Sequence, residues 1–508
     1  MAKNSKTKYN FSGNYEDYKA LLRNFTLDKL ITRINIESAK IMINPENEIC
    51  YGVIQASYHI TNLRNLSKIS QNVFVTGWNL IDLSYNAIIS SNDFRGKEIE
   101  NDEELYLLVS AMENVREKRE SEFINSLSED DITELLLYLW GFTGEQLKVE
   151  TLSKVPINAS RELYILFESS KNVEGISDIA DIVIKETGID WETVITSLYL
   201  AWFGSILNPN IMELEQNIKW DNGLNHEAFN KVIERYTTTY EEIRGSELGR
   251  QYLYTKPFVK TQHNDLLSVN CFLNLFLYEH CILWIVRDYY RHQDNQIFTS
   301  EFGRCFEAYF KELLEDYLEP EEFSRIPEEN TKRADWKIQI GDYKFLIEQK
   351  STVLGLTAKQ QKSNIETIKI FSNRHIIKAL HQLENTELGF NDGKYIKIVL
   401  IYEDYLQTEM LENVFSMKSC DIKNDYYFWL VTIEEIEMLL YICKHDRKLF
   451  YDVISEKVKR EFEKAKNGRS LQKILNEKGI ESNQHLKQKK FLKYERLAID
   501  NALKYLWT

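Results

Sequence analysis

The stretch Arg333-Ala-Asp-Trp-Lys-Ile-Gln-Ile-Gly-Asp-Tyr-Lys-Phe-Leu-Ile-Glu-Gln-Lys350 decides how the C-terminal half of the chain folds. It holds two runs of alternating apolar and polar residues on either side of Gly341-Asp342. Alternation with a period of two indicates β-strands, and a Gly-Asp turn between two such runs indicates a hairpin. The sequence therefore predicts two antiparallel strands joined at Gly341.

Three ionisable side chains are predicted at one end of this hairpin. Successive side chains on a strand point to opposite faces, so Glu348 and Lys350 share one face while Phe345 and Ile347 lie on the other. Asp335 precedes the first strand, which places it beside the end of the second. We therefore expect an acid and a lysine side by side, with a second acid next to them.

Helices and further strands are predicted around the hairpin. Apolar residues recur at helical spacing over 300–316 and over 373–387, and Thr432-Ile-Glu-Glu435 predicts the capped start of a later helix. Shorter apolar runs predict strands at 323–326, 395–402 and 427–431. Glu307 lies on a face of the first helix that otherwise packs, and a buried carboxylate is costly unless it is paired or bound to a metal ion.

The order of these elements and the placement of their polar residues resemble the PD-(D/E)XK nuclease superfamily over residues 296–450 of the 508. The resemblance depends on Gly303-x-x-Phe-Glu307 in the helix, Asp335 before the first hairpin strand and Glu348-Gln-Lys350 at the end of the second. The acid-x-Lys tripeptide alone is a weak signal, because it recurs elsewhere in the chain. Ala334 stands where the family's proline would lie, a frequent variation in this superfamily.

The resemblance implies an α/β nuclease domain, with a mixed sheet flanked by helices in αβββαβ order. It also implies hydrolysis of phosphodiester bonds that depends on Mg²⁺, for which Mn²⁺ can substitute. By resemblance, Asp335 and Glu348 bind the metal ion together with the backbone carbonyl of Gln349. Lys350 would hold and polarise the attacking water, and Glu307 would reach the same centre from the helix.

Contacts to the substrate are a weaker implication of the same resemblance. Lys378 and Gln382, one helical turn apart, resemble the helix-borne polar pair that contacts phosphate in some family members. Arg333, at the start of the hairpin, is a further candidate for a substrate contact.

Other interpretations of these residues stay open. Lys350 with Glu348 or Asp335 could form an ordinary cross-strand ion pair, which when exposed contributes only about 0–1 kcal/mol. The chain would then be a non-catalytic nucleic-acid-binding or scaffold protein on a decayed nuclease fold. A nuclease acting on RNA or on DNA ends is a third interpretation.

Charge is distributed unevenly along the chain. The formal net charge of −15 argues against a protein that coats nucleic acid or a membrane surface. The segment 455–508 nevertheless carries 14 Lys and Arg against 7 Asp and Glu, a local +7. This tail is predicted either to contact nucleic acid or to dock as a helix on acidic neighbours.

Four regions are predicted along the chain. Residues 1–115 form a mixed α/β region of unknown function, and 116–295 form a helical region for sensing, assembly or scaffolding. The nuclease-like domain covers 296–450, and a basic helical tail covers 451–508. Two expectations are more detailed: a hairpin formed by 39–44 and 49–57, and an apolar core helix over 264–290, whose polar residues argue against a membrane span.

The setting predicted for the protein is a reducing cytoplasm without membrane attachment. The six cysteines are scattered without a Cys-x-x-Cys pair, and no signal peptide is visible. We expect a DNA endonuclease, by its architecture a prokaryotic restriction or anti-phage defence effector. Expected partners are DNA, a second copy of the chain, because cutting both strands usually needs two active sites, and a protein of the same defence system.

Overall fold

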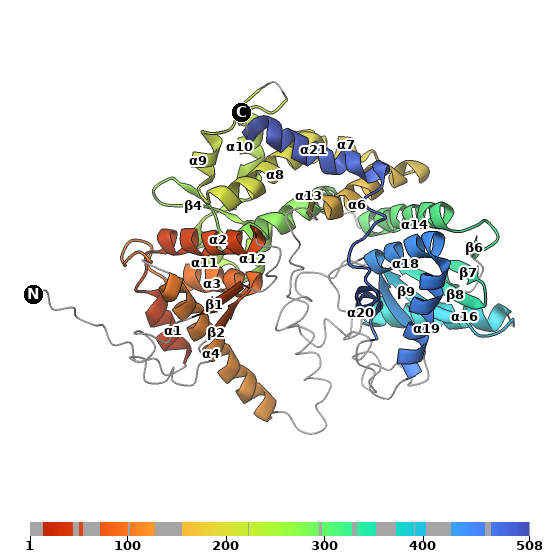
Figure 1. Ribbon diagram of the computed structural model, residues 1–508. Helices are drawn as coiled ribbons and strands as arrows, with labels where there is room; N and C mark the ends of the chain where they lie inside the picture. The colour runs from red at the N-terminus through yellow and green to blue at the C-terminus, as the bar shows by residue number, and fades with distance from the viewer. Residues whose placement is uncertain are drawn as a thin grey trace, which may run out of the picture.

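A mainly helical N-terminal region precedes a sheet-bearing C-terminal region in the computed structural model (Figure 1). The structure describes residues 14–43, 50–53, 72–99, 102–126, 155–221, 223–293, 297–327, 333–351, 372–390, 392–402, 428–462 and 469–506. In Figure 1 the sheet-bearing region lies on the right and the first helices on the left, both below α6, α8 and α13.

In its described residues, the first region has four helices and one two-stranded antiparallel sheet. Its elements are α1 (Tyr15–Leu22), α2 (Leu27–Ile43), β1 (Cys50–Val53), β2 (Asn72–Val75), α3 (Gly77–Ser90) and α4 (Asp102–Ser126). The hairpin predicted at 39–44 and 49–57 is wrong in its first half, because 39–43 end α2. Ala39, Ile41 and Met42 are buried there, and β1 pairs with β2 instead.

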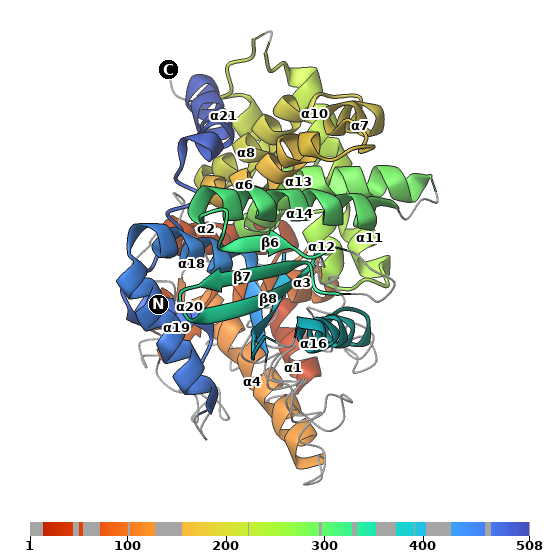
Figure 2. The same cartoon turned by 90° about the vertical axis from the view of Figure 1, so that its right-hand side faces the viewer.

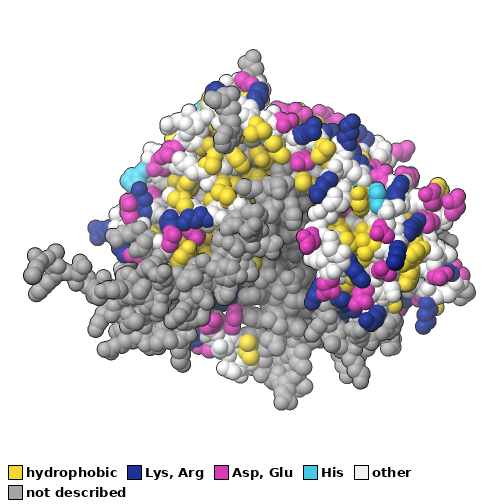
Figure 3. Space-filling model, in the orientation of Figure 1, with side chains coloured by type: hydrophobic (Ala, Val, Ile, Leu, Met, Phe, Trp, Pro, Cys, Tyr) yellow, Lys and Arg dark blue, Asp and Glu magenta, His cyan; other side chains and the backbone are white. Residues whose placement is uncertain are grey.

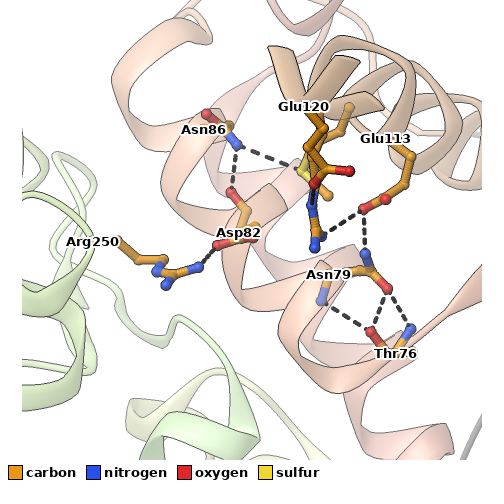
Figure 4. A network of polar contacts seen from close by, with 9 residues as sticks. Thr76, Asn79, Asp82, Asn86, Glu113, Glu120 and Arg250 are labelled. Atoms are coloured by element: carbon orange, nitrogen blue, oxygen red, sulfur yellow. Dashed lines mark hydrogen bonds and ion pairs between the residues drawn. The ribbon is translucent and has the colours of Figure 1, made fainter. Parts of the chain in front are cut away.

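A polar network joins α3 and α4 (Figure 4). Thr76 caps α3 through a capping box with Asn79, whose side-chain amide donates a hydrogen bond of 2.5 Å to Glu113 of α4. On the same helix α3, Asp82 forms an ion pair with Arg250. The network therefore supplies partners for polar groups of α3 from two distant parts of the sequence.

Helices continue through the middle of the chain. They are α6 (Val155–Phe167), η3 (Ser169–Asn172), α7 (Ile179–Thr187), α8 (Trp191–Leu207), α9 (Ile211–Glu215), α10 (His226–Arg235), α11 (Tyr240–Gly245), α12 (Gln251–Thr255) and α13 (Cys271–His292). A small sheet in the order β3-β4-β5 lies among them, formed by β3 (Thr237–Thr238), β4 (Phe258–Lys260) and β5 (Leu266–Ser268).

Helix α13 is the predicted core helix, and it packs against α6, α7 and α8. It is shorter than predicted because 266–268 form β5 and Asn270 caps the helix. Its polar residues have partners inside the protein: the amide of Asn274 donates to Ser205 and Ser268, and His280 bonds to Glu162. None of the described helices combines the length and apolar character that a membrane-spanning segment needs.

In the part of the chain that the structure describes, five strands form the C-terminal sheet in the order β10-β9-β8-β7-β6. They are β6 (Phe323–Arg325), β7 (Trp336–Ile340), β8 (Tyr343–Lys350), β9 (Ile396–Ile401) and β10 (Trp429–Thr432). Strands β6, β7 and β8 are antiparallel neighbours, whereas β8, β9 and β10 are parallel. Together with α14 (Ile297–Tyr317), the π-helix η5 (Ser372–Ile377) and α16 (Lys378–Phe390), they give the order of elements predicted from the sequence.

The hairpin at Gly341 is confirmed. Ile340 pairs with Tyr343, and Gly341 between them has φ = 56°, the left-handed region that favours glycine. A Cβ atom at this position would also lie 2.6 Å from the hydroxyl of Tyr451. The turn fixes the register of β7 against β8, and thereby the positions of the residues at the far end of both strands.

Helices cover both faces of the sheet. In Figure 2, strands β7 and β8 lie between α16 and the pair α14 and α18 (Ile433–His445). Trp336 and Ile347 belong to the main core with Phe310 of α14, while Leu346 is buried on the other face of β8, where α16 packs. The capping box predicted between Thr432 and Glu435 starts α18.

The C-terminal tail turns back onto the middle of the chain. After α19 (Arg447–Phe462) and α20 (Leu471–Glu477), helix α21 (Lys489–Leu506) packs against α6 and α8. The predicted region boundaries after residues 115 and 450 lie inside α4 and α19. The tail is therefore continuous with the sheet-bearing region at one end and docked on the helical region at the other.

One buried ion pair joins these regions. Arg161 of α6 and Glu437 of α18 are 4% and 0% exposed, and the guanidinium donates to both carboxylate oxygens at 2.8–3.1 Å. Tyr309 of α14 and Asn483 of the tail also donate to Glu437. A carboxylate buried this deeply is tolerated because Arg161, Tyr309 and Asn483 all donate hydrogen bonds to it.

We expect Arg161→Ala to lower the free energy of unfolding by about 3–5 kcal/mol, because it leaves the Glu437 carboxylate buried without its cation. Urea unfolding followed by circular dichroism measures this change. Lys311→Ala is the matched control, since it breaks an exposed ion pair with Glu315 on α14 and should cost less than about 1 kcal/mol. An equal, small effect of both substitutions would show that the buried pair does not hold the regions together.

Candidate active site

The predicted site lies where β7 begins and β8 ends. The register pairs Trp336 with Ile347, so the preceding residue, Asp335, lies opposite Glu348 on the neighbouring strand. Directly opposite residues on antiparallel strands point to the same face. Asp335, Glu348 and Lys350 therefore share the face of the sheet on which α16 packs.

Glu348 and Lys350 form a nearly buried ion pair. The side chain of Glu348 is only 3% exposed, and its Oε1 accepts a hydrogen bond of 2.5 Å from Lys350 Nζ. Lys350 also donates to the side-chain oxygen of Gln382 on α16, at 3.2 Å. The ammonium is thus held between strand β8 and helix α16.

Asp335 is held against the same strand by the backbone. Its Oδ2 accepts a hydrogen bond of 2.7 Å from the backbone N–H of Gln349. The side chain of Gln349 turns to the opposite face, where it accepts from the Trp336 indole at 2.7 Å and donates to the carbonyl of Phe306. This anchoring fixes the backbone of Gln349 between the two carboxylates.

Helix α16 holds the residues before β7 through two hydrogen bonds, and a third bond within the helix orients Thr386. Gln382 donates to the backbone carbonyl of Arg333 at 3.1 Å. Thr386 accepts from the N–H of Ala334 at 2.8 Å and donates to the carbonyl of Gln382 at 2.7 Å. Sequence reasoning missed Thr386, whose signal is a buried hydroxyl one turn after Gln382 on the packed face of the helix.

Burial raises the pKa of Glu348 to about 8, the charge of Asp335 adds to the rise, and the Lys350 ammonium opposes it. Its second oxygen, Oε2, is buried and has no hydrogen-bond partner among the residues that the structure describes. Two carboxylates that repel each other in this way gain from a cation placed between them.

His375 is a second perturbed group nearby. It lies on η5, and burial lowers its pKa to about 4, with the charges of Lys350, Arg374 and Lys378 adding to the effect. The imidazole is therefore neutral at neutral pH. Arg374 and Lys378 lie near His375 in the sequence, and both are exposed.

Some predicted site residues lie in other settings. Glu307 of α14 forms an ion pair with Arg325 of β6 rather than a described contact with Glu348. The side chain of Arg333 lies alongside Gly389 on α16, at 3.7 Å from where a Cβ would be. The structure thus brings together Asp335, Glu348 and Lys350 with Gln382, which serves there as a partner of Lys350.

The donors present fit a hard divalent cation. No group of three or more His, Cys, Asp or Glu side chains that could hold a metal ion occurs within the described ranges. Mg²⁺, however, is commonly bound by one or two carboxylates, with waters and substrate oxygens completing its ligands. The opposed carboxylates of Asp335 and Glu348, with an unpartnered buried oxygen on the latter, fit this pattern.

Comparison with known proteins gives no relative. No protein-family model matches the chain, and no curated protein or solved structure shows a significant similarity to it.

The stability of the protein should depend on the protonation of Glu348. The native state holds this proton more tightly than the unfolded chain, whose carboxyl has its ordinary pKa of 4.5. The stability that protonation of Glu348 adds to the native state is therefore fully present below about pH 4.5 and is lost as the pH rises through about 8. We expect the melting temperature of the wild type, relative to Glu348→Gln, to fall between these values in EDTA.

Glu315→Gln is the control for this titration, because Glu315 is a half-exposed carboxylate on α14. This variant measures the effect of removing a surface carboxylate, against which the effect of Glu348→Gln is compared. Parallel melting curves for the wild type and Glu348→Gln would contradict a raised pKa at Glu348.

Proposed function

We propose that the chain is a metal-dependent nuclease of the PD-(D/E)XK type that hydrolyses phosphodiester bonds in DNA as an endonuclease. The observation that supports this proposal best is the buried Glu348 carboxylate, 2.5 Å from Lys350 Nζ and opposite Asp335. A structural ion pair alone gains little from burial, because desolvation offsets the attraction of the charges. The second carboxylate, that of Asp335, raises the free energy of the empty site further unless a metal ion lies between the two acids.

Asp335 and Glu348 would hold the metal ion, with the backbone carbonyl of Gln349 as a third ligand. When bound, Mg²⁺ supplies charge neutralisation for the phosphoryl oxygens and lowers the pKa of a bound water. Lys350, oriented by Glu348 and Gln382, would hold the attacking water and offset phosphate charge. Glu307, which forms an ion pair with Arg325, would reach the same centre from α14.

Metal binding should release protons. Glu348 is largely protonated at pH 7 when the site is empty, since its pKa is about 8, and a carboxylate ligand must be ionised. We expect calorimetric titration with Mg²⁺ or Mn²⁺ at pH 7 to release up to about one proton, measured from the dependence of the heat on the buffer. Glu348→Gln should lose this release, and Asp335→Ala should lose binding. Identical titrations for wild type and Asp335→Ala would eliminate the site.

Cleavage of DNA should depend on Lys350 and Glu348. Lys350→Ala and Glu348→Gln should reduce Mg²⁺-dependent nicking and linearisation of plasmid DNA by at least about 100-fold, because transition-state charge loses its stabilisation. Lys344→Ala is the matched control: it removes a lysine of the same strand that pairs with Asp392, and activity should persist.

Other outcomes of this assay distinguish the remaining interpretations. Cutting of RNA but not DNA, lost in the same variants, would keep the site and change the substrate. Inactivity of the folded wild type on every nucleic acid would favour a binding or scaffold protein. Normal cutting by both variants would place the active site elsewhere.

The basic tail is a weaker candidate for the DNA-binding surface than the sequence suggests. Lys490, Lys493 and Lys504 of the tail form ion pairs with Asp316, Glu168 and Asp221. On the face that Figure 3 shows, basic and acidic side chains are interspersed over the described sheet-bearing region. These pairs favour the docked, structural interpretation of the tail.

DNA binding should therefore depend on exposed cations near Lys350. We expect Arg374→Ala and Lys378→Ala to weaken DNA binding and to reduce the slope of log Kd against log salt by about 0.9 for each phosphate that the variant no longer neutralises. Lys490→Ala, in the tail, is the control and should leave affinity and slope unchanged. The reverse pattern in a fluorescence anisotropy titration would assign DNA binding to the tail.

The biological setting we propose is defence against invading DNA, in a prokaryotic cytoplasm, with a partner protein of the same system. A second copy of the chain would provide the second active site needed to cut both strands. This part of the proposal depends only on the resemblance in architecture.

A further inference from the structure

A cavity of about 590 Å³ lies outside the proposed nuclease site, where α21 docks on the helical region. It is lined by the end of α6, η3, the first turns of α7 and α8, and α21. In Figures 1 and 2, α7, α8 and α21 lie well away from β7 and β8. Its volume lies in the range of small-molecule sites, which is about 300–1,000 Å³.

One wall of the cavity is aromatic. The rings of Phe167 and Trp191 have centroids 4.3 Å apart and planes inclined by 32°, and Tyr494 of α21 lies 6.1 Å from Trp191. Phe167 and Trp191 are only partly buried. Aromatic faces attract cations, and Lys493 already lies 4.7 Å from the centre of the Tyr494 ring.

The side chains that line the cavity carry more negative than positive charge. Lys171 and Lys493, the two lining cations, both form ion pairs with Glu168. Asp178 and Glu192 line the same cavity and are exposed. The lining therefore has three carboxylates against two ammonium groups, and the cations are already occupied.

We propose that this cavity binds an organic cation with a flat charged group, best matched by a guanidinium. Such a group stacks on an indole ring and bonds to carboxylates with its planar edge. Trp191 would provide the ring, and Asp178 and Glu192 the carboxylates. An anionic ligand would meet an excess of negative charge and would compete with Glu168 for both lysines.

Because the lining comes from both α21 and the helical region, the ligand binds the docked tail and stabilises it by mass action. This inference is independent of the proposed nuclease activity.

The test uses agmatine, a small guanidinium compound, as the probe and AMP as the anionic comparison. Full-length protein is titrated with each by calorimetry, and melting temperatures are measured at 10 mM probe. We expect agmatine to bind and to raise the melting temperature, and AMP to do neither. Binding of AMP without agmatine, or no agmatine binding at 10 mM, would overturn the proposal.

Three variants locate the binding. Asp178→Asn removes a charge but keeps a residue that can cap α7, and Glu192→Gln removes the second charge. Each should weaken agmatine binding about threefold, and Trp191→Phe should weaken it by a similar factor. Glu174→Gln, an exposed acid in the same loop that does not line the cavity, should bind as wild type does. Unchanged affinity in all three lining variants would also overturn the proposal.

Discussion

The ion pair between Arg161 and Glu437 is the interaction on which the arrangement of the chain depends. It joins α6 of the helical region to α18 beside the sheet. Asn483 of the tail donates a hydrogen bond to the same carboxylate. Next to it, His485 lies fully buried between the hydroxyls of Tyr309 and Tyr317. Burial lowers the pKa of His485 well below its usual value, and the charges of Lys490 and Arg161 add to this effect.

This junction explains why α14 can carry two roles. One face of the helix supplies Tyr309 to the buried junction, while Phe306 and Phe310 pack beneath the sheet at Gln349 and Trp336. Movement of α14 would therefore disturb the regional interface and the backbone between Asp335 and Glu348 at once. The helical region is thus mechanically connected to the candidate site through α14.

Local signals predicted the parts of the fold that local chemistry determines. The turn at Gly341 requires a residue with a left-handed backbone conformation, and the capping box at Thr432 needs only a residue three positions later. Both features could therefore be predicted from the sequence. The pairing of Glu348 with Lys350 followed from strand alternation alone. The hairpin expected at 39–44 failed, because the short apolar run fits a buried helix end equally well.

Long-range partners could not be predicted, because nothing nearby in the sequence marks them. Glu307 was expected at the metal centre, yet its ion-pair partner is Arg325, which comes from a strand edge 18 residues later. The position of Thr386, one turn after Gln382, did not identify its partner, because the hydrogen bond to Ala334 depends on where α16 crosses the sheet. In each case the sequence shows a polar residue on a packed helix face, whereas its partner is determined by tertiary packing.

The distribution of positive charge follows from the same packing. A tail with 14 basic residues looks like a nucleic-acid-binding segment when read alone, but the chain as a whole has a net charge of −15 and offers many acidic partners. Three of its lysines pair with acids from α14, the loop after α6 and the loop before α10. These ion pairs hold the tail against the rest of the protein, and they leave the three lysines less able to bind phosphate. Arg374 of η5 and Lys378 of α16 are instead exposed, and their charges, with that of Lys350, help to lower the pKa of His375.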